Sequence, residues 1–181
     1  MFLGELACGA SNPREFIGGG TRAMNILVDS REQHGFSFSG YNCTVISGTL
    51  TTGDYSVVGL EDRCAVERKS LDDLLGCLTG DGRDRFEREL ARGRGLDAFT
   101  VVVEASFQDV ADGKYRSKMK PHAALQSILA FSSRYRTQFL FAGNRKGAEY
   151  ATYHFLRHYL RDMREIVKHI QPAEKSVKKG V

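Results

Sequence analysis

Three short apolar runs along the chain have the length and composition of buried β-strands. They span residues 25–28 (NILV), 98–103 (AFTVVV) and 137–141 (TQFLF). Short continuous apolar runs bounded by polar segments are typical of strands that are covered on both faces. The first run ends at Asp29 and the second is followed by Glu104, so the pattern predicts core strands with an acid at one end.

Three further stretches combine β-branched, aromatic and polar residues. They are residues 41–48 (YNCTVISG), 54–59 (DYSVVG) and 64–69 (CAVERK). Turn residues separate them, and residues 60–63 (LEDR) fit the turn of a β-hairpin between the last two. We therefore expect a group of strands in the first half of the chain that forms an initial β-meander.

The predicted hairpin brings charged residues together. Antiparallel pairing around residues 60–63 is expected to place Ser56 opposite Glu67 and Asp54 close to Lys69. Because side chains alternate along a strand, Glu67 and Lys69 should project from one face of the sheet and Arg68 from the other. Asp54, Glu67 and Lys69 are then expected to meet at one end of the sheet.

The remaining periodic segments predict helices. Ser70 fits the N-cap of a helix whose apolar face contains Leu71, Leu74, Leu75 and Leu78. Residues 80–84 (GDGRD) lack the oxygen spacing of a calcium loop and are interpreted as a turn before a charged helix, residues 84–90, that the glycines after it end.

Two longer helices are expected in the second half of the chain. The first begins with Pro121 in its first turn and should direct Leu125, Ile128 and Leu129 inward. The second spans about residues 147–169 and is apolar on nearly all sides, which fits either a thick core or a contact with a second subunit.

Strands that alternate with helices predict an α/β fold with a mixed central β-sheet flanked by helices. Residues 24–170 are expected to form this domain, residues 1–23 a flexible lead-in and residues 171–181 a flexible basic tail. At 181 residues, the chain has the length of a single domain.

Composition narrows the class of protein. The chain is 41% hydrophobic and 27% charged, which is ordinary for a globular domain. No apolar run approaches the roughly 20 residues of a membrane-spanning helix, and the first residues do not resemble a signal peptide. Four separated cysteines without CxxC spacing indicate reduced thiols in an intracellular protein rather than zinc ligands or disulfides.

The net charge of +4 is small, but the basic residues are clustered. Five arginines, including Arg83 and Arg85, lie within residues 83–94, and Lys118 belongs to a basic loop. Such clusters favour a polyanion as a partner, although a solvated charged face explains them equally well. His154 and His158 have a metal-compatible spacing, but without a third ligand they are interpreted as ordinary helix residues.

Asp54, Glu67 and Lys69 fit the chemistry of a hard divalent cation. Mg²⁺ binds carboxylate oxygens and commonly also a phosphate oxygen. It lowers the pKa of a bound water and neutralises charge on a phosphate under attack, while a lysine orients the water or stabilises the developing charge. The alternative is a hairpin in which the three residues only form a ladder of salt bridges.

The surrounding residues favour the first interpretation. The sequence VDSRE at residues 28–32 precedes GDY at residues 53–55 and ERKSLDD at residues 67–73. This order resembles the nuclease domain of the XPF family of structure-specific endonucleases, which includes the archaeal Hef nuclease and has a restriction-endonuclease-like fold. The family signature is GD, a gap, ERK, three residues and D, and the resemblance covers about residues 26–159.

The resemblance implies roles for individual residues. Asp54 and Glu67 correspond to metal ligands for Mg²⁺ or Mn²⁺, and Lys69 to the catalytic lysine. Asp29 corresponds to a further acid that binds the metal directly or through water. Glu32, Arg68 and Asp73 are supporting residues. Arg31, like Arg83, Arg85 and Lys118, is a candidate for contacts with DNA, and Arg68 is suited either to a phosphate or to a structural salt bridge.

The chain departs from the family at two positions. It has Glu89 where glutamine is common, which puts a hydrogen-bonding role there in doubt. It has Ala105 after Glu104 where glycine is common, and Glu104 is interpreted as a strand-end acid facing solvent or as an outer acid of the site.

The resemblance implies a metal-dependent DNA endonuclease that acts on branched or flapped DNA. It also implies a homodimer or a pair with a related subunit, located with nucleic acid inside the cell and without a membrane. The alternative is a non-catalytic subunit that binds DNA or a nuclease partner, as in inactive members of the family. Such members typically lose the acids or the lysine, whereas this chain has all of them.

Overall fold

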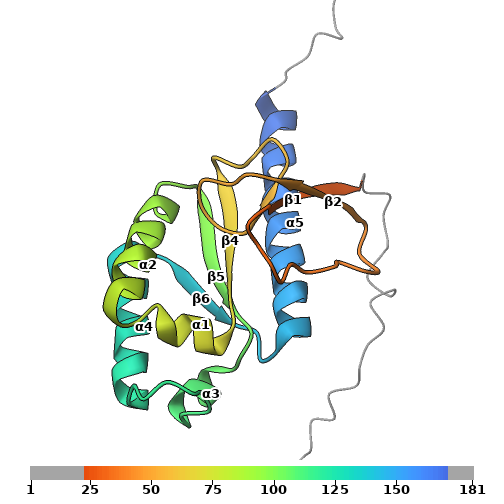
Figure 1. Cartoon of the computed structure of the whole chain (residues 1–181). Coiled ribbons are helices and arrows are strands. Elements are labelled where there is room, and N and C mark those ends of the chain that lie inside the picture. Colours follow the sequence, from red (N-terminus) through yellow and green to blue (C-terminus); the bar gives the residue numbers. More distant parts are fainter. Residues whose placement is uncertain (1–22, 171–181) are drawn as a thin grey trace, which may run out of the picture.

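The computed structural model describes residues 23–170, and the predictions for residues 1–22 and 171–181 lie outside this range. A six-stranded sheet is covered by helices on both faces (Figure 1). Its elements are β1 (Met24–Asp29), β2 (Cys43–Gly48), β3 (Tyr55–Val57), β4 (Cys64–Lys69), α1 (Leu71–Gly76), α2 (Gly80–Gly93), β5 (Ala98–Val103), α3 (Phe107–Ala111), α4 (Pro121–Tyr135), β6 (Gln138–Phe141) and α5 (Arg145–Ile170).

The sheet is mixed, as predicted. Its order is β2-β1-β3-β4-β5-β6. Strand β3 runs antiparallel to both of its neighbours, whereas the β1–β2, β4–β5 and β5–β6 pairs are parallel. The prediction of an initial meander is wrong, because β2 pairs in parallel with the outer edge of β1 and β3 pairs with its inner edge.

Alternation along the strands directs side chains into two cores. In β5, Val102 packs with the α5 side of the sheet, whereas Val101 and Val103 pack with the side that α1, α2 and α4 cover. The α5 core also contains stacked Phe36 and Tyr55. The two faces of β4 therefore meet different helices, which decides the surroundings of its charged end.

Several local predictions are confirmed. The Ser70 hydroxyl accepts a hydrogen bond from the amide of Asp73 and caps α1, and Pro121 begins α4. Two predictions are wrong. Residues 80–84 are not a turn, because α2 begins at Gly80. Leu129 does not face inward, since it is 51% exposed on the outer side of α4.

The described residues include three of the four cysteines. Cys43, Cys64 and Cys77 are free thiols. No helix within residues 23–170 is both long enough and apolar enough to cross a membrane.

Candidate active site

The carboxyl end of β4 and the turn before β3 form the candidate site. Tyr55 pairs with Val66, so the predicted pairing of Ser56 with Glu67 is wrong by two residues. A shift of two residues leaves every side chain on its original face. Asp54 and Glu67 therefore still approach each other, and Glu67 forms an ion pair with Lys69 on the same face.

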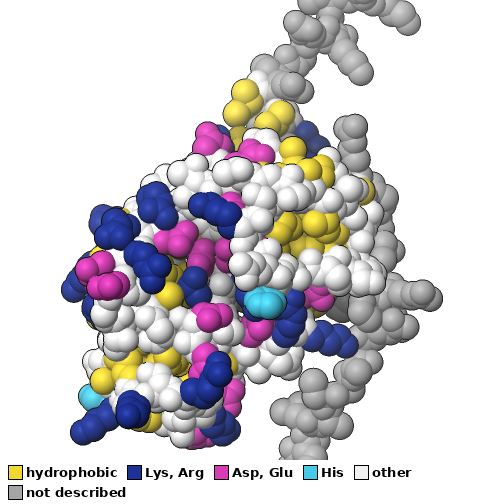
Figure 2. Space-filling model, viewed as in Figure 1, with side chains coloured by type: hydrophobic (Ala, Val, Ile, Leu, Met, Phe, Trp, Pro, Cys, Tyr) yellow, Lys and Arg dark blue, Asp and Glu magenta, His cyan; other side chains and the backbone are white. Residues whose placement is uncertain are grey.

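A polar hollow of about 250 Å³ lies at this end of the sheet. Five acids line it, together with arginines from a loop and from a helix: Asp29, Arg31, Glu32, Asp54, Glu67, Glu89 and Arg92. In the same view as Figure 1, Lys and Arg side chains gather over the surface of α2, and Asp and Glu side chains lie beside them (Figure 2). The predicted convergence of Asp54 and Glu67 therefore leads to a shared depression.

Four of the five acids have a cationic partner. Asp29 binds Arg31, Glu67 binds Lys69 and Glu89 binds Arg92. Glu32 lies 3.6 Å from the Arg68 guanidinium. Among residues 23–170, Asp54 alone of the five forms no ion pair, and its Oδ2 accepts a hydrogen bond of 2.8 Å from the backbone amide of Arg68.

Burial raises the pKa of Asp54 to about 6, and the negative charges of Glu32 and Glu89 add to the shift. Burial also raises the pKa of Glu67, although the neighbouring Lys69 opposes the change. Burial, the largest cause of both shifts, disfavours the charged form of each carboxyl group, whereas a nearby cation favours it. A divalent cation between them would restore the balance.

Lys69 remains protonated in this setting. Burial is the largest single influence and by itself would lower its pKa, but the charge and hydrogen bond of Glu67, together with the charges of Cys77 and Asp54, raise the pKa overall. Its ammonium group also lies over the ring of Phe86, 5.3 Å from the centroid. Lys69 is therefore a fixed cation at the edge of the site rather than a ready proton acceptor.

The donor set fits a hard divalent ion with two protein ligands. Within the described part of the chain, no group of three or more His, Cys, Asp or Glu side chains is arranged to hold a metal ion. Mg²⁺ commonly takes one or two carboxylates and completes its shell with waters and a substrate phosphate. Asp54 and Glu67 would hold such an ion between them.

Asp29, the third expected ligand, is engaged by the protein itself. Its two oxygens accept hydrogen bonds of 2.8 Å and 2.9 Å from the Arg31 side chain and one of 2.7 Å from the amide of Leu50. The Arg31 hydrogen bonds lower the pKa of Asp29 to about 2. Asp29 thus shapes the hollow as a permanent anion, and its role as a ligand remains a prediction.

The supporting residues separate in space. The Glu32 carboxylate lines the hollow, whereas Asp73 lies at the start of α1, where it binds Ser70. Arg68 points to the opposite face of β4 and binds Glu104 at 2.7 Å. This contact fits the structural salt bridge considered for Arg68, and the prediction that Glu104 faces solvent is wrong because its side chain is only 12% exposed.

The candidate DNA contacts also differ in their surroundings. Arg31 is exposed at the rim of the hollow. Arg83 is less available because it packs on the ring of Phe131 and pairs with Glu87. Arg85 and Lys118 are exposed, the first on α2 and the second in the loop before α4.

Sequence reasoning missed the part that α2 plays in the site. Glu89 accepts a hydrogen bond of 3.1 Å from the amide of Gly53, and Arg92 donates one of 3.3 Å to the hydroxyl of Thr52. Both contacts hold the turn that leads into Asp54. Although Glu89 departs from the residue common in the family, its side chain still accepts a hydrogen bond. The charged residue at this position was the signal in the sequence that could have indicated a role for α2 in the site.

Comparisons with known proteins identify a family and similar folds. A family model described as the ERCC4 domain matches residues 28–154, well over half of the chain. The structure of XPF from Aeropyrum pernix is similar, with a TM-score of 0.61 and 22% identity over 80% of this chain and 69% of that one. XPF from the same organism in complex with DNA gives a TM-score of 0.56 and 20% identity over 77% of this chain and 66% of that one. A search of curated proteins finds no match.

Proposed function

The chain belongs to the ERCC4 domain family, and from this membership and the geometry of the site we propose that it is a divalent-metal-dependent DNA endonuclease. The membership and the fold shared with the Aeropyrum pernix XPF structure confirm the resemblance to XPF nuclease domains. That relative has also been solved with DNA, which supports DNA as the substrate of this chain.

One observation carries the proposal. Asp54 is an acid without an ion pair among the described residues, in a hollow that it shares with Glu67, and the fixed cation Lys69 lies beside them. A purely structural hairpin would be expected to pair each buried charge. The deficit of positive charge at Asp54 matches the need for a cation from solution.

Each residue of the site has a distinct role in the proposed phosphodiester hydrolysis. Mg²⁺ or Mn²⁺ held there supplies Lewis acidity and lowers the pKa of water. Asp54 and Glu67 would hold the ion, and the backbone amide of Arg68 fixes Asp54 by donating a hydrogen bond to it. The ammonium group of Lys69 stabilises the negative charge that develops on the phosphate oxygens.

The basic residues at the rim would position the DNA backbone. Arg31 is exposed beside the hollow, and Arg85 and Arg88 lie on the exposed face of α2. Contacts with phosphates fix the register of a duplex without reading its sequence. The proposed substrate is branched or flapped DNA. We also propose that two chains pair through α5, because the exposed side chains of Tyr150 and Ile166 leave this helix partly uncovered.

Cleavage assays test the proposal. Labelled flap, fork and linear duplexes are incubated with the protein in Mg²⁺, in Mn²⁺ and in chelator. We expect metal-dependent cutting that Lys69→Ala abolishes while DNA binding is retained. Lys168→Ala is the matched control, because Lys168 pairs with Glu165 on the surface of α5.

A different result would favour the non-catalytic subunit. If the protein binds DNA but cuts none of the substrates with either metal, the endonuclease proposal fails. If Lys168→Ala reduces cutting as much as Lys69→Ala does, the assigned role of Lys69 fails.

A further inference from the structure

The guanidinium group of Arg68 lies behind the site rather than in it. Alternation along β4 directs Arg68 to the α5 side, opposite to Glu67 and Lys69. Its side chain is 9% exposed, and its Cζ lies 6.0 Å from the centroid of the Phe36 ring. A cation that is permanently charged is thus buried one residue away from the proposed metal ligand Glu67.

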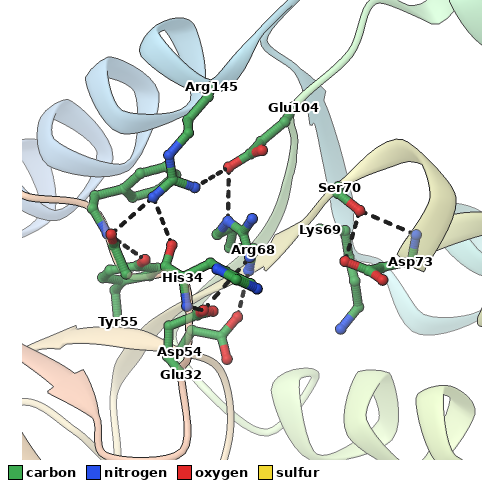
Figure 3. A network of polar contacts seen from close by, with 12 residues as sticks. Glu32, His34, Asp54, Tyr55, Arg68, Lys69, Ser70, Asp73, Glu104 and Arg145 are labelled. Atoms are coloured by element: carbon green, nitrogen blue, oxygen red, sulfur yellow. Dashed lines mark hydrogen bonds and ion pairs between the residues drawn. The ribbon is translucent and has the colours of Figure 1, made fainter.

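Glu104 binds that cation on the α5 side of the sheet. Its Oε1 accepts a hydrogen bond of 2.7 Å from Nε of Arg68 and one of 2.8 Å from Nη1 of Arg145 (Figure 3). Glu104 follows directly after β5, and its amide binds the carbonyl of Lys69. Glu104 is absent from the lining of the hollow, so it reaches the site only through other residues.

Arg145 extends the contact to the loop that carries Glu32. Its Nη2 donates hydrogen bonds of 2.6 Å and 2.8 Å to the carbonyls of His34 and Gly35 (Figure 3). Its Cζ also lies 4.9 Å from the centroid of the Phe36 ring. One carboxylate therefore connects the end of β4, the first residue of α5 and the loop beside the hollow.

We propose that Glu104 is a positioning residue of the active site, which holds Arg68 away from the metal-binding carboxylates and, through Arg145, fixes the loop that carries Glu32. This inference rests on the proposed function, because it concerns the same site. Glu104 needs no contact with substrate or metal for this role.

The reason is a competition between cations. Without the charge of Glu104, the anion that remains close to the Arg68 side chain is Glu32, at 3.6 Å. A closer Arg68–Glu32 pair would bring positive charge toward Asp54, which already binds the Arg68 amide. A divalent ion would then meet a repelling charge at its own site, since Coulomb interactions weaken slowly with distance in a poorly solvated region.

The test is Glu104→Gln, which keeps the shape and removes the charge. Mn²⁺ affinity is measured by calorimetry, and amide hydrogen exchange is measured for the peptide covering residues 32–38. We expect Mn²⁺ to bind about tenfold more weakly, as is typical for loss of an outer-shell partner. Exchange of the peptide should become severalfold faster, because the hold of Arg145 on the loop is weakened.

Three further variants separate positioning from general destabilisation. Asp97→Asn removes another acid that binds an arginine, Arg63, and a tyrosine away from the site, and it should change neither readout. Arg145→Gln should speed exchange and leave Mn²⁺ affinity within twofold of the unmodified chain. The double variant Arg68→Gln, Glu104→Gln removes the competing cation as well and should restore Mn²⁺ affinity.

The outcomes distinguish this inference from the proposed function. If Glu104→Gln changes neither Mn²⁺ affinity nor exchange, or if the double variant binds Mn²⁺ as weakly as Glu104→Gln, the inference is overturned. If the unmodified chain binds Mn²⁺ and the variants behave as expected but no DNA is cut, the endonuclease proposal fails and the inference stands. If the unmodified chain binds no Mn²⁺, the proposed metal site fails. If amide hydrogen exchange is then also the same in Glu104→Gln as in the unmodified chain, the positioning role is overturned too.

Discussion

Replacing the unpaired acid of the hollow should stabilise the protein in the absence of metal. Asp54→Asn keeps an oxygen that accepts the hydrogen bond from the Arg68 amide but removes the charge. Burial raises the pKa of Asp54 from 3.8 to about 6. A raised pKa means that the folded protein prefers the neutral carboxyl, so the ionised form opposes folding at neutral pH.

The magnitude follows from the size of the shift. The difference between a pKa of 3.8 in the unfolded chain and one of about 6 in the folded protein corresponds to at most ~3 kcal/mol at pH 7.5. Asp54 retains partial exposure in the hollow, and solvent screening reduces the expected gain to about 2 kcal/mol. The gain should shrink to about half at pH 5 and vanish below pH 3.8, because Asp54 is then neutral in both the folded and unfolded states.

Urea denaturation in chelator measures this prediction. The free energy of unfolding is compared for the unmodified chain and Asp54→Asn at pH 7.5 and pH 5. Saturating Mg²⁺ should then stabilise the unmodified chain and leave the variant almost unchanged, since a ligand stabilises only the state that binds it. If Asp54→Asn is less stable than the unmodified chain in chelator at pH 7.5, the argument from uncompensated charge is refuted.

Three other substitutions probe the supports of the site and its core. Glu89→Gln keeps an acceptor for the Gly53 amide but removes a negative charge from the lining of the hollow. Because that charge attracts a cation, Mg²⁺ affinity measured by calorimetry should fall severalfold; unchanged affinity would mean that Glu89 is only structural. Gly53 has a φ of 77°, and a Cβ there would lie 3.0 Å from the Val66 carbonyl oxygen; Gly53→Ala should cost about 1–2 kcal/mol in urea denaturation and reduce cutting, and full cutting would contradict the role of this turn. Phe131 is fully buried on the inner face of α4, so Phe131→Ala should lower the free energy of unfolding by about 3–5 kcal/mol without changing Mn²⁺ affinity per folded molecule.

The sequence was sufficient for the features that depend on local periodicity. Alternation along β4 separated Glu67 and Lys69 from Arg68, and the structure keeps that separation. The Ser70 cap and the Pro121 start are equally local, because the groups that satisfy them lie within one turn of the chain. The motif from VDSRE to ERKSLDD was enough to identify the family, because a family signature is defined by residue types in a given order and not by distances in space.

The tertiary structure alone decided which charges meet across the fold. Glu89 reaches Gly53 over 36 positions, and Arg145 reaches Gly35 over 110. No periodicity within a segment encodes such contacts. They depend on how helices pack against the sheet and on the register in which β3 pairs with β4. The sequence therefore determined which side chains share each face of the sheet. Packing determined that Glu89 binds the turn before Asp54, that Glu104 is buried between two arginines, and that Asp54 forms no ion pair among the described residues.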